Sequence, residues 1–305
     1  MLLNYLSNNL ILTPKFISDI ADTASERYNK FSISKENNKN RVVYQPQKEL
    51  KLLQRVLHDD FLSKITPHPC CTAYRDGAST YKNAIQHKEN KYLLRLDFVD
   101  FFKSITSNDI FLFLKEHSTN LHAEWSEDDT ELFLKIVCYK GRLTMGSVTA
   151  PALSNLVCKS LDYRISELCS ARGITYTRYS DDMYFSTNKE NILLSLTTSI
   201  IEIIRNIDYP KHLIINSSKT KHSSRKRKMT VTGLVITNDK KISLGRDKKR
   251  EIRSFVYKWD TLDTQQKKHL QGYLSYCASV EPLFINSLCI KYGAAIISKI
   301  QRYKP

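Results

Sequence analysis

The stretch Tyr179-Ser180-Asp181-Asp182 lies between two short runs rich in aromatic and β-branched residues, 174–178 and 183–187. This pattern predicts a β-hairpin with two adjacent carboxylates at its tip. Like charges so close repel one another unless a cation or a change of pKa relieves them, and a divalent metal ion is the simplest relief. A solvated turn is the commoner explanation for an isolated Asp-Asp pair, so the decision rests on other carboxylates in the chain.

A further carboxylate, Asp97, stands near the end of the apolar run 92–98, which has the composition of a buried strand. A carboxylate in such a place is costly to bury unless it is paired or bound to a metal. If it converges with the hairpin pair, three carboxylates form a hard oxygen site suited to Mg²⁺. Two such ions about 4 Å apart serve phosphoryl transfer. A hydrolase is compatible with this chemistry, but the spacing favours a polymerase palm.

The charge of the chain indicates a polyanionic partner. Lys and Arg number 47 against 31 Asp and Glu, a net charge of +16, which favours nucleic acid over solubility charge alone. Basic residues gather between 219 and 258, interleaved with the aromatic residues Phe255, Tyr257 and Trp259, which we expect on one helix. Basic groups for phosphates beside aromatic faces for stacking are typical of a nucleic-acid surface.

Seven cysteines show neither a Cys-x-x-Cys pair nor a Cys/His spacing typical of zinc sites. Their odd number and apolar surroundings predict reduced, mostly buried thiols of a cytosolic protein. Residues 1–12 lack a basic n-region and a cleavage site, and no run reaches about 18 apolar residues. We therefore expect a soluble, unexported protein without a membrane segment.

Periodicity and capping signals predict the remaining elements. A loop is expected over 34–40, and strands over 41–46, 213–216 and 231–235. Helices are expected over 14–29, 47–63, 79–88, 107–117, 126–139, from Pro151 to Gly173, over 191–206, and twice within 262–299.

At this point the residues resemble those of a bacterial retron reverse transcriptase. The stretch 179–182 is similar to the Tyr-x-Asp-Asp box of reverse transcriptases, and Leu-Asp-Phe-Val-Asp-Phe-Phe at 96–102 to their first aspartate motif. Asn-Ala-Ile-Gln-His at 83–87 resembles the retron Asn-Ala-x-x-His segment, and Val-Thr-Gly at 231–233 the retron Val-Thr-Gly segment. The similarity runs from about residue 41 to 258, with a plausible thumb beyond.

The resemblance implies an α+β, right-hand polymerase fold. It would comprise an N-terminal helical extension (1–40), fingers (41–90), a palm (91–235) and a helical thumb with an RNA-binding region (236–305). The antiparallel sheet of the palm would carry the catalytic aspartates, and a further fingers segment would be interleaved around 103–150.

The resemblance also implies roles for residues of the polymerase site. Asp97 and Asp181 would be the principal ligands of two Mg²⁺ ions, with Asp182 beside them and the Phe98 carbonyl as a further ligand. The implied nucleotide-binding residues are Arg41 and Arg75 as clamps of the triphosphate, Phe102 as the steric gate against a ribose 2′-OH, Gly146 in the pocket loop, and Lys219 as general acid near the leaving phosphate.

The implied substrates are dNTPs and a cognate structured non-coding RNA. Priming from the 2′-OH of a guanosine would yield a branched RNA–DNA hybrid, msDNA, and the enzyme would serve bacterial antiphage defence with a toxic effector protein, in a possible higher-order complex. The implied RNA-binding residues are Asn83, His87, Val231, Thr232, Gly233, Arg246, Lys249, Arg250 and Arg253.

Two departures from the family pattern stand out. Thr144 and Met145 occupy the places of Pro and Gln in a Leu-Pro-Gln-Gly box, and Ser180 replaces the more usual Ala between Tyr and Asp. Neither removes a carboxylate. Two alternatives remain open, namely another bacterial reverse transcriptase of the group II intron or diversity-generating type, and a non-catalytic nucleic-acid scaffold.

Overall fold

The structure, a computed structural model, describes residues 1–34 and 40–304, so the loop expected over 34–40 lies almost entirely outside the described residues. The chain forms two compact units. The first contains Met1–Ala78, Leu94–Phe185 and Glu190–Lys221, and the second Ser79–Leu93, Ser186–Lys189 and His222–Pro305. Residues 79–90, assigned above to the fingers, thus cluster with the C-terminal helices, and the division into fingers, palm and thumb stays a prediction.

A four-stranded sheet carries the predicted aspartates. Its order is β4-β5-β3-β6, with β3 at Tyr92–Asp97, β4 at Thr175–Tyr179, β5 at Asp182–Thr187 and β6 at Lys221–Ser224. The amides of Lys91 and Phe98 donate to the carbonyls of Thr187 and Asp181 respectively, so β3 and β5 run antiparallel. The predicted hairpin and the predicted strand ending near Asp97 are both confirmed.

Helices of the first unit pack against this sheet and one another. They include α5 (Phe101–Ser104), α8 (Ala150–Val157), α9 (Lys159–Arg172) and α10 (Leu196–Arg205). The single helix expected after Pro151 is in fact α8 and α9, which meet at Cys158. Gly173 ends α9 in the left-handed conformation, φ 68°, as its sequence position predicts. The strand expected over 213–216 amounts to one bridge between Phe98 and Ile215.

The N-terminal helices form part of a second group of helices. This group consists of α1 (Leu2–Leu10), α2 (Pro14–Asp22), α3 (Lys48–Val56), α6 (Ser107–Leu121) and α7 (Glu127–Val137). A capping box of Ser126 and Asp129 begins α7, and the Asp129 carboxylate also accepts from the N-terminal ammonium at 2.9 Å. Beyond α3 the helix expected to residue 63 continues as a π-helical turn, Leu57–Phe61.

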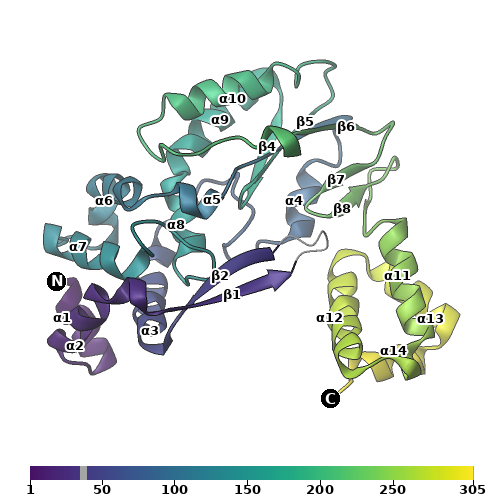
Figure 1. The fold of residues 1–305 in the computed structure, drawn as a ribbon. Coiled ribbons are helices and arrows are strands. Elements are labelled where there is room, and N and C mark those ends of the chain that lie inside the picture. The colour runs from purple at the N-terminus through teal and green to yellow at the C-terminus, as the bar shows by residue number, and fades with distance from the viewer. Residues whose placement is uncertain (35–39, 305) are drawn as a thin grey trace. The chain divides into compact units, whose positions relative to one another are not determined.

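A long hairpin of β1 (Tyr28–Ser34) and β2 (Asn40–Pro46) joins these helices (Figure 1). The strand at 41–46 is confirmed, but β1 was not predicted, and the helix expected over 14–29 ends at Asp22. Phe31 and Ile33 of β1 alternate with serines, but all residues after Tyr28 are exposed, so no buried face specifies the strand. Pairing with β2 specifies it instead.

The second unit combines a small sheet with a helical bundle. Its elements are α4 (Thr80–Gln86), β7 (Met229–Val231), β8 (Leu234–Ile236), β9 (Ile242–Ser243), α11 (Arg246–Tyr257), α12 (Thr264–Val280), α13 (Pro282–Tyr292) and α14 (Ala294–Gln301). No helix in the described part of the chain is long and apolar enough to cross a membrane.

Three sequence predictions are wrong in this unit. The segment 231–235 is not one strand but the β7–β8 hairpin, whose turn residues Thr232 and Gly233 have φ 46° and 82°. Three helices, not two, follow residue 262. Trp259 lies beyond α11 in a 3₁₀ turn and is only 2 % exposed, so it fills the core instead of offering a stacking face.

His87, at the C-terminus of α4, is completely buried within the second unit. Its Nδ1 lies 2.7 Å from the Ser186 hydroxyl. Burial penalises the imidazolium and lowers the pKa of His87 from 6.5 to about 3.

We therefore expect acid to destabilise the fold through His87. Below its ordinary pKa of 6.5 the unfolded chain protonates this imidazole, whereas the folded chain does not until about pH 3. The contribution is fully present above 6.5 and falls with pH, by about 2 kcal/mol at about pH 5. Urea unfolding of the native protein and His87→Asn at about pH 7.5 and 5 measures it, and an equal pH dependence of both proteins would contradict the prediction.

Candidate active site

Asp97 closes β3, and its carboxylate is buried against a lysine. Only 2 % of Asp97 is exposed, and the Lys219 ammonium donates to its two oxygens at 2.8 and 3.0 Å. The Asp97 carbonyl accepts from the Asn216 amide at 2.7 Å, which holds the segment before Lys219 beside the strand end. The cost of burying this carboxylate is thus offset by a cation of the chain.

Asp182, the first residue of β5, is held by a different cation. Arg95 donates to Asp182 Oδ1 through Nε at 3.0 Å and Nη2 at 2.7 Å, and the Tyr184 hydroxyl donates to Oδ2 at 3.2 Å. Burial nevertheless raises the pKa of Asp182, a shift that Arg95 opposes and that the nearby Asp181 and Asp97 reinforce.

Asp181 occupies the hairpin tip and, of the three aspartates, is the one that lines a cavity. It is half-buried, and its carbonyl accepts from the Phe98 amide at 3.2 Å. Ser180 before it has φ 61°, a left-handed conformation that turns the chain. Asp97 and Asp181 thus lie near Asp182, at the end of β3 and at the tip of the β4–β5 hairpin, but in the described residues the oxygens of the three aspartates do not all lie within 4.8 Å of one another.

The cavity beside Asp181 has a volume of about 390 Å³. Predicted site residues that line it are Arg41, Phe98, Phe102, Asp181 and Lys219, and further lining comes from Asn40, Val42, Tyr74, Asp100, Phe101, Lys103, Thr144, Met145 and Ser180. Arg75 is exposed and lines a separate, smaller cavity beside Asn155. Of the five predicted nucleotide-binding residues, the structure therefore brings Arg41, Phe102 and Lys219 to one cavity and leaves Arg75 apart from them.

Gly146 lies behind the cavity wall, where the chain passes close to β2. A Cβ at this position would lie 2.5 Å from the Tyr44 carbonyl oxygen, and φ is 103°. The Tyr44 amide donates to the Met145 carbonyl at 2.9 Å. Gly146 thus permits the close approach that places Thr144 and Met145, the two residues departing from the family pattern, at the cavity.

A buried ion pair supports the hairpin from below. Arg178 on β4 donates to both oxygens of Asp162 on α9, through Nε at 2.8 Å and Nη2 at 2.6 Å. Both side chains have no exposed area. The remaining Arg178 nitrogen, Nη1, donates to the Ser180 carbonyl at 3.1 Å, one residue before Asp181. The pair was not predicted, and its only signal in the sequence is a charged residue within an apolar strand.

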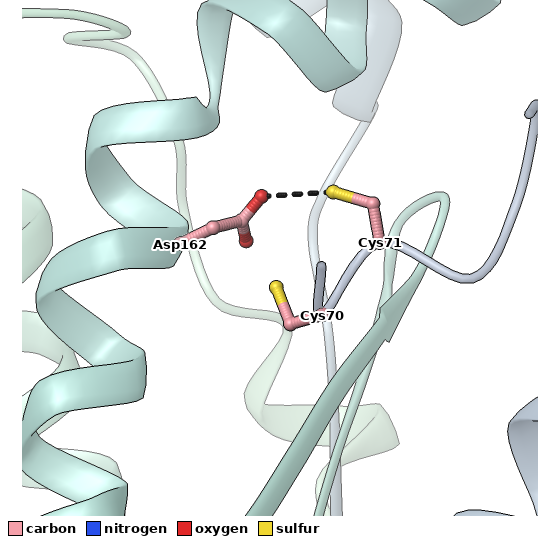
Figure 2. Close-up of side chains that lie close together, drawn as sticks. All are labelled: Cys70, Cys71 and Asp162. Atoms are coloured by element: carbon pink, nitrogen blue, oxygen red, sulfur yellow. Dashed lines mark hydrogen bonds between the residues drawn. The ribbon is translucent and has the colours of Figure 1, made fainter. Parts of the chain in front are cut away.

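Cys70 and Cys71 face the same carboxylate (Figure 2). The Cys71 thiol donates to Asp162 Oδ2 at 3.1 Å, and burial raises the pKa of Cys70 well above its ordinary value. Metal ligation requires thiolates, and the Arg178 guanidinium, 3.0 Å from Cys71 Sγ, would repel a cation here. This cluster is therefore best explained as structural.

The predicted RNA-binding residues lie in the second unit in two environments. Asn83, His87 and Val231 are buried, so they can act only by shaping the surface. Gly233 is exposed at the β7–β8 tip and lines a cavity of about 380 Å³ with Lys228, Lys248 and Tyr273.

The four basic residues predicted on α11 differ as well. Arg246 and Arg250 are exposed, whereas Lys249 pairs with Glu281 at 2.5 Å. Arg253 lies over the ring of Phe284, 5.2 Å from its centroid. The roles of these side chains stay predictions.

The comparisons with known proteins agree with this geometry. Residues 33–236 match the family described as Reverse transcriptase (RNA-dependent DNA polymerase). The chain is 32% identical to the Retron Ec83 reverse transcriptase of Escherichia coli over 95% of each protein. It is also 32% identical to the Retron Ec86 reverse transcriptase of Escherichia coli, over 91% of this chain and 86% of that one.

Among solved structures, apo telomerase from Candida tropicalis has a similar fold, with a TM-score of 0.51 at 10% sequence identity. The match covers 91% of this chain and 58% of the telomerase chain, and at this identity it concerns the fold alone.

Fold and site together define a nucleic-acid polymerase of the right-hand type, as expected from the sequence. Within that class, the chain belongs to the bacterial retron reverse transcriptases, and it is an RNA-directed DNA polymerase.

We expect Asp162→Asn to destabilise the protein by about 3–5 kcal/mol, because it leaves the buried Arg178 guanidinium without a counter-charge. The matched control is Asp247→Asn, which breaks the exposed pair with Lys228 and should cost less than about 1 kcal/mol. Urea unfolding compares the two variants. A similar loss of unfolding free energy in both variants would show that the buried pair contributes no more to stability than the exposed one.

Proposed function

We propose that the cavity beside Asp181 receives an incoming dNTP and that Asp97, Asp181 and Asp182 serve two Mg²⁺ ions there. Members of the reverse transcriptase family generally depend on divalent metals. The observation that carries the proposal is the convergence of the strand-end Asp97 with the hairpin pair beside a cavity of about 390 Å³. Carboxylates and the adjacent Phe98 backbone offer the hard oxygen donors that Mg²⁺ prefers. Bound ions would activate the primer hydroxyl and neutralise the leaving pyrophosphate.

In this proposal the surrounding side chains position the nucleotide. Arg41 and Lys219, which both line the cavity, supply positive charge for the triphosphate. Lys219, half-exposed and now bonded to Asp97, is placed to exchange that carboxylate for the leaving phosphate and to protonate it. Phe102 borders the sugar as the gate against a 2′-OH. Arg75 would reach the triphosphate only after a movement of its exposed loop.

The proposed template is the enzyme's cognate structured non-coding RNA. In this proposal synthesis starts from the 2′-OH of a guanosine and yields branched msDNA, in the bacterial cytoplasm and in the service of antiphage defence with an effector protein, within a higher-order complex. Relatives bearing the printed name retron reverse transcriptase support the retron assignment. The excess charge of +16 supports a nucleic-acid partner.

The second unit is the proposed reader of this RNA. Gly233, at the exposed β7–β8 tip, would approach the RNA backbone closely, while Thr232 is tied to the unit by its hydroxyl, which donates to the Thr80 carbonyl at 3.0 Å. Buried His87 and Asn83 would hold α4 under this hairpin, in agreement with the contacts of α4 with β7 and β8. The exposed Arg246 and Arg250 would bind phosphates.

We expect Asp181→Asn and Asp182→Asn each to reduce templated DNA synthesis by at least about a hundredfold, because neutral amides cannot compensate the charge of the transferring phosphate. RNA binding should be unchanged. The assays are dNTP incorporation on an RNA template and recovery from cells of a DNA that RNase and debranching enzyme shorten. The exposed Asp208→Asn is the control. Full synthesis by Asp181→Asn would refute the site.

For RNA recognition, the informative pair is Gly233→Ala and Gly293→Ala. Both glycines have positive φ, 82° and 93°, with open space where a Cβ would stand, so alanine meets no steric clash at either position and its cost there is confined to the backbone. We expect Gly233→Ala alone to weaken binding of the cognate RNA, by about tenfold, with little effect on an unrelated structured RNA. Filter binding at fixed salt measures both affinities. An equal loss on both RNAs would contradict sequence-specific recognition by this hairpin.

A further inference from the structure

Tyr74 connects the cavity wall to the catalytic turn. Its hydroxyl donates to the Ser180 hydroxyl oxygen at 2.9 Å, although the two residues are 106 positions apart. The Tyr74 side chain also lines the cavity together with Phe102, and the two ring centroids are 6.3 Å apart. One side chain therefore touches both the space proposed for the nucleotide and the residue that precedes Asp181.

Both partners of this hydrogen bond are held in strained conformations. Tyr74 has φ 57° and Ser180 has φ 61°, in the left-handed region that residues other than glycine seldom adopt. Such strain persists only where the surroundings impose it, and it is found commonly at functional sites.

The surroundings that impose it are well defined. The Ala73 carbonyl accepts from the Asn155 side chain at 2.9 Å, and the Thr72 amide donates to the Arg178 carbonyl at 2.8 Å. The Ser180 carbonyl accepts from the Arg178 guanidinium. Arg178 thus anchors the loop that carries Tyr74 as well as the turn that carries Ser180.

We propose that Tyr74 is a positioning and selectivity residue of the polymerase site. Its hydroxyl fixes Ser180 and, through the turn, the direction of Asp181, while its ring and that of Phe102 form two aromatic walls around the sugar of the incoming nucleotide. A nucleotide that pushes the Tyr74 ring aside also loosens the turn, so the fit of the sugar is coupled to the reaction rate. This inference rests on the proposed role of the cavity as the dNTP site.

The hydroxyl and the ring can be tested separately. Tyr74→Phe and Ser180→Ala each remove the hydrogen bond between these two side chains while keeping an aromatic ring at position 74 and the ring of Phe102. The double variant removes the same single hydrogen bond. Tyr74→Ala removes the aromatic wall as well. Tyr163→Phe, on an exposed tyrosine of α9 in the same unit, is the matched control.

Two measurements separate binding from chemistry. Steady-state incorporation of dTTP and of UTP on an RNA template with a DNA primer gives kcat and KM for both sugars. Binding of dTTP to the complex with a chain-terminated primer gives a Kd without any reaction.

We expect Tyr74→Phe and Ser180→Ala each to lower kcat by about three- to tenfold with the dTTP Kd changed less than about twofold, since a single hydrogen bond is lost. The double variant should be no worse than either single variant, because both remove the same bond. Tyr74→Ala should in addition raise the dTTP Kd by about tenfold and increase the use of UTP relative to dTTP.

Other outcomes overturn the proposal. If the single effects multiply in the double variant, the two hydroxyls act independently; if only the melting temperature falls while kcat and the dTTP/UTP ratio stay constant, the bond is merely structural. A different result would sink the dNTP site itself, namely an unchanged dTTP Kd after Phe102→Ala and Arg41→Ala. The two failures are therefore distinguishable.

Discussion

The bidentate contact between Arg178 and Asp162 is the interaction on which the geometry of the turn that carries Asp181 depends. A fully buried ion pair adds little net stability over apolar residues of the same size, because desolvation cancels most of the attraction. Its value lies in geometry. The guanidinium has five donors in a rigid plane, and here they reach Asp162, Cys71, Asn155 and the Ser180 carbonyl. Burial alone would raise the pKa of Asp162, but the guanidinium outweighs burial and lowers it, so the pair stays charged. Helix α9, strand β4, the segment before Tyr74 and the turn before Asp181 are thereby fixed to one point.

The three aspartates near the hairpin tip differ in their pairing with basic side chains. Three neighbouring carboxylates without basic partners would destabilise the fold, because like charges repel and raise one another's pKa. Asp97 is matched by Lys219 and Asp182 by Arg95, which leaves Asp181 as the carboxylate that faces the cavity. Lys219 and Arg95 therefore occupy positions where positive charge stabilises the site in the absence of substrate. The same Lys219 lies at the cavity, where a triphosphate would compete with Asp97 for it. In the proposed function, Lys219 would therefore leave Asp97 and pair with the triphosphate when the nucleotide binds.

The parts of the site that were predictable from sequence are those set by short-range patterns. The hairpin 174–187 and the strand-end Asp97 follow from alternation, turn chemistry and the cost of an unpaired carboxylate, and the structure confirms both. The Arg178–Asp162 pair is not predictable, because it joins a strand to a different element, α9, and no local pattern marks Asp162 as a buried residue. The exposed strand β1 escaped prediction because pairing, not burial, specifies it. The sequence predicts a strand through the Val-Thr-Gly segment because Val231 and Thr232 are β-branched. Gly233 is the local signal for the turn that the structure shows there. Trp259 was placed on a surface by its basic neighbours, although its size makes burial the stronger tendency.

Several basic residues of the second unit pair with acidic residues of the same unit, which limits their contribution to binding phosphates. Lys249 is neutralised by Glu281, whose other oxygen accepts from the Leu244 amide and the Ser243 hydroxyl, so this carboxylate closes the segment before α11. Lys228 pairs with Asp247 and Lys248 with Glu251, and Lys248 also lies 4.7 Å from the Tyr273 ring centroid. A count of lysines and arginines therefore overstates the number of phosphate contacts that α11 can offer. Since each phosphate contact contributes close to one unit to the slope of log affinity against log salt, that slope reports the exposed arginines and lysines and not the formal charge of +16. Because these lysines are already held by carboxylates of the same unit, the phosphate contacts proposed for α11 depend on its exposed arginines, Arg246 and Arg250.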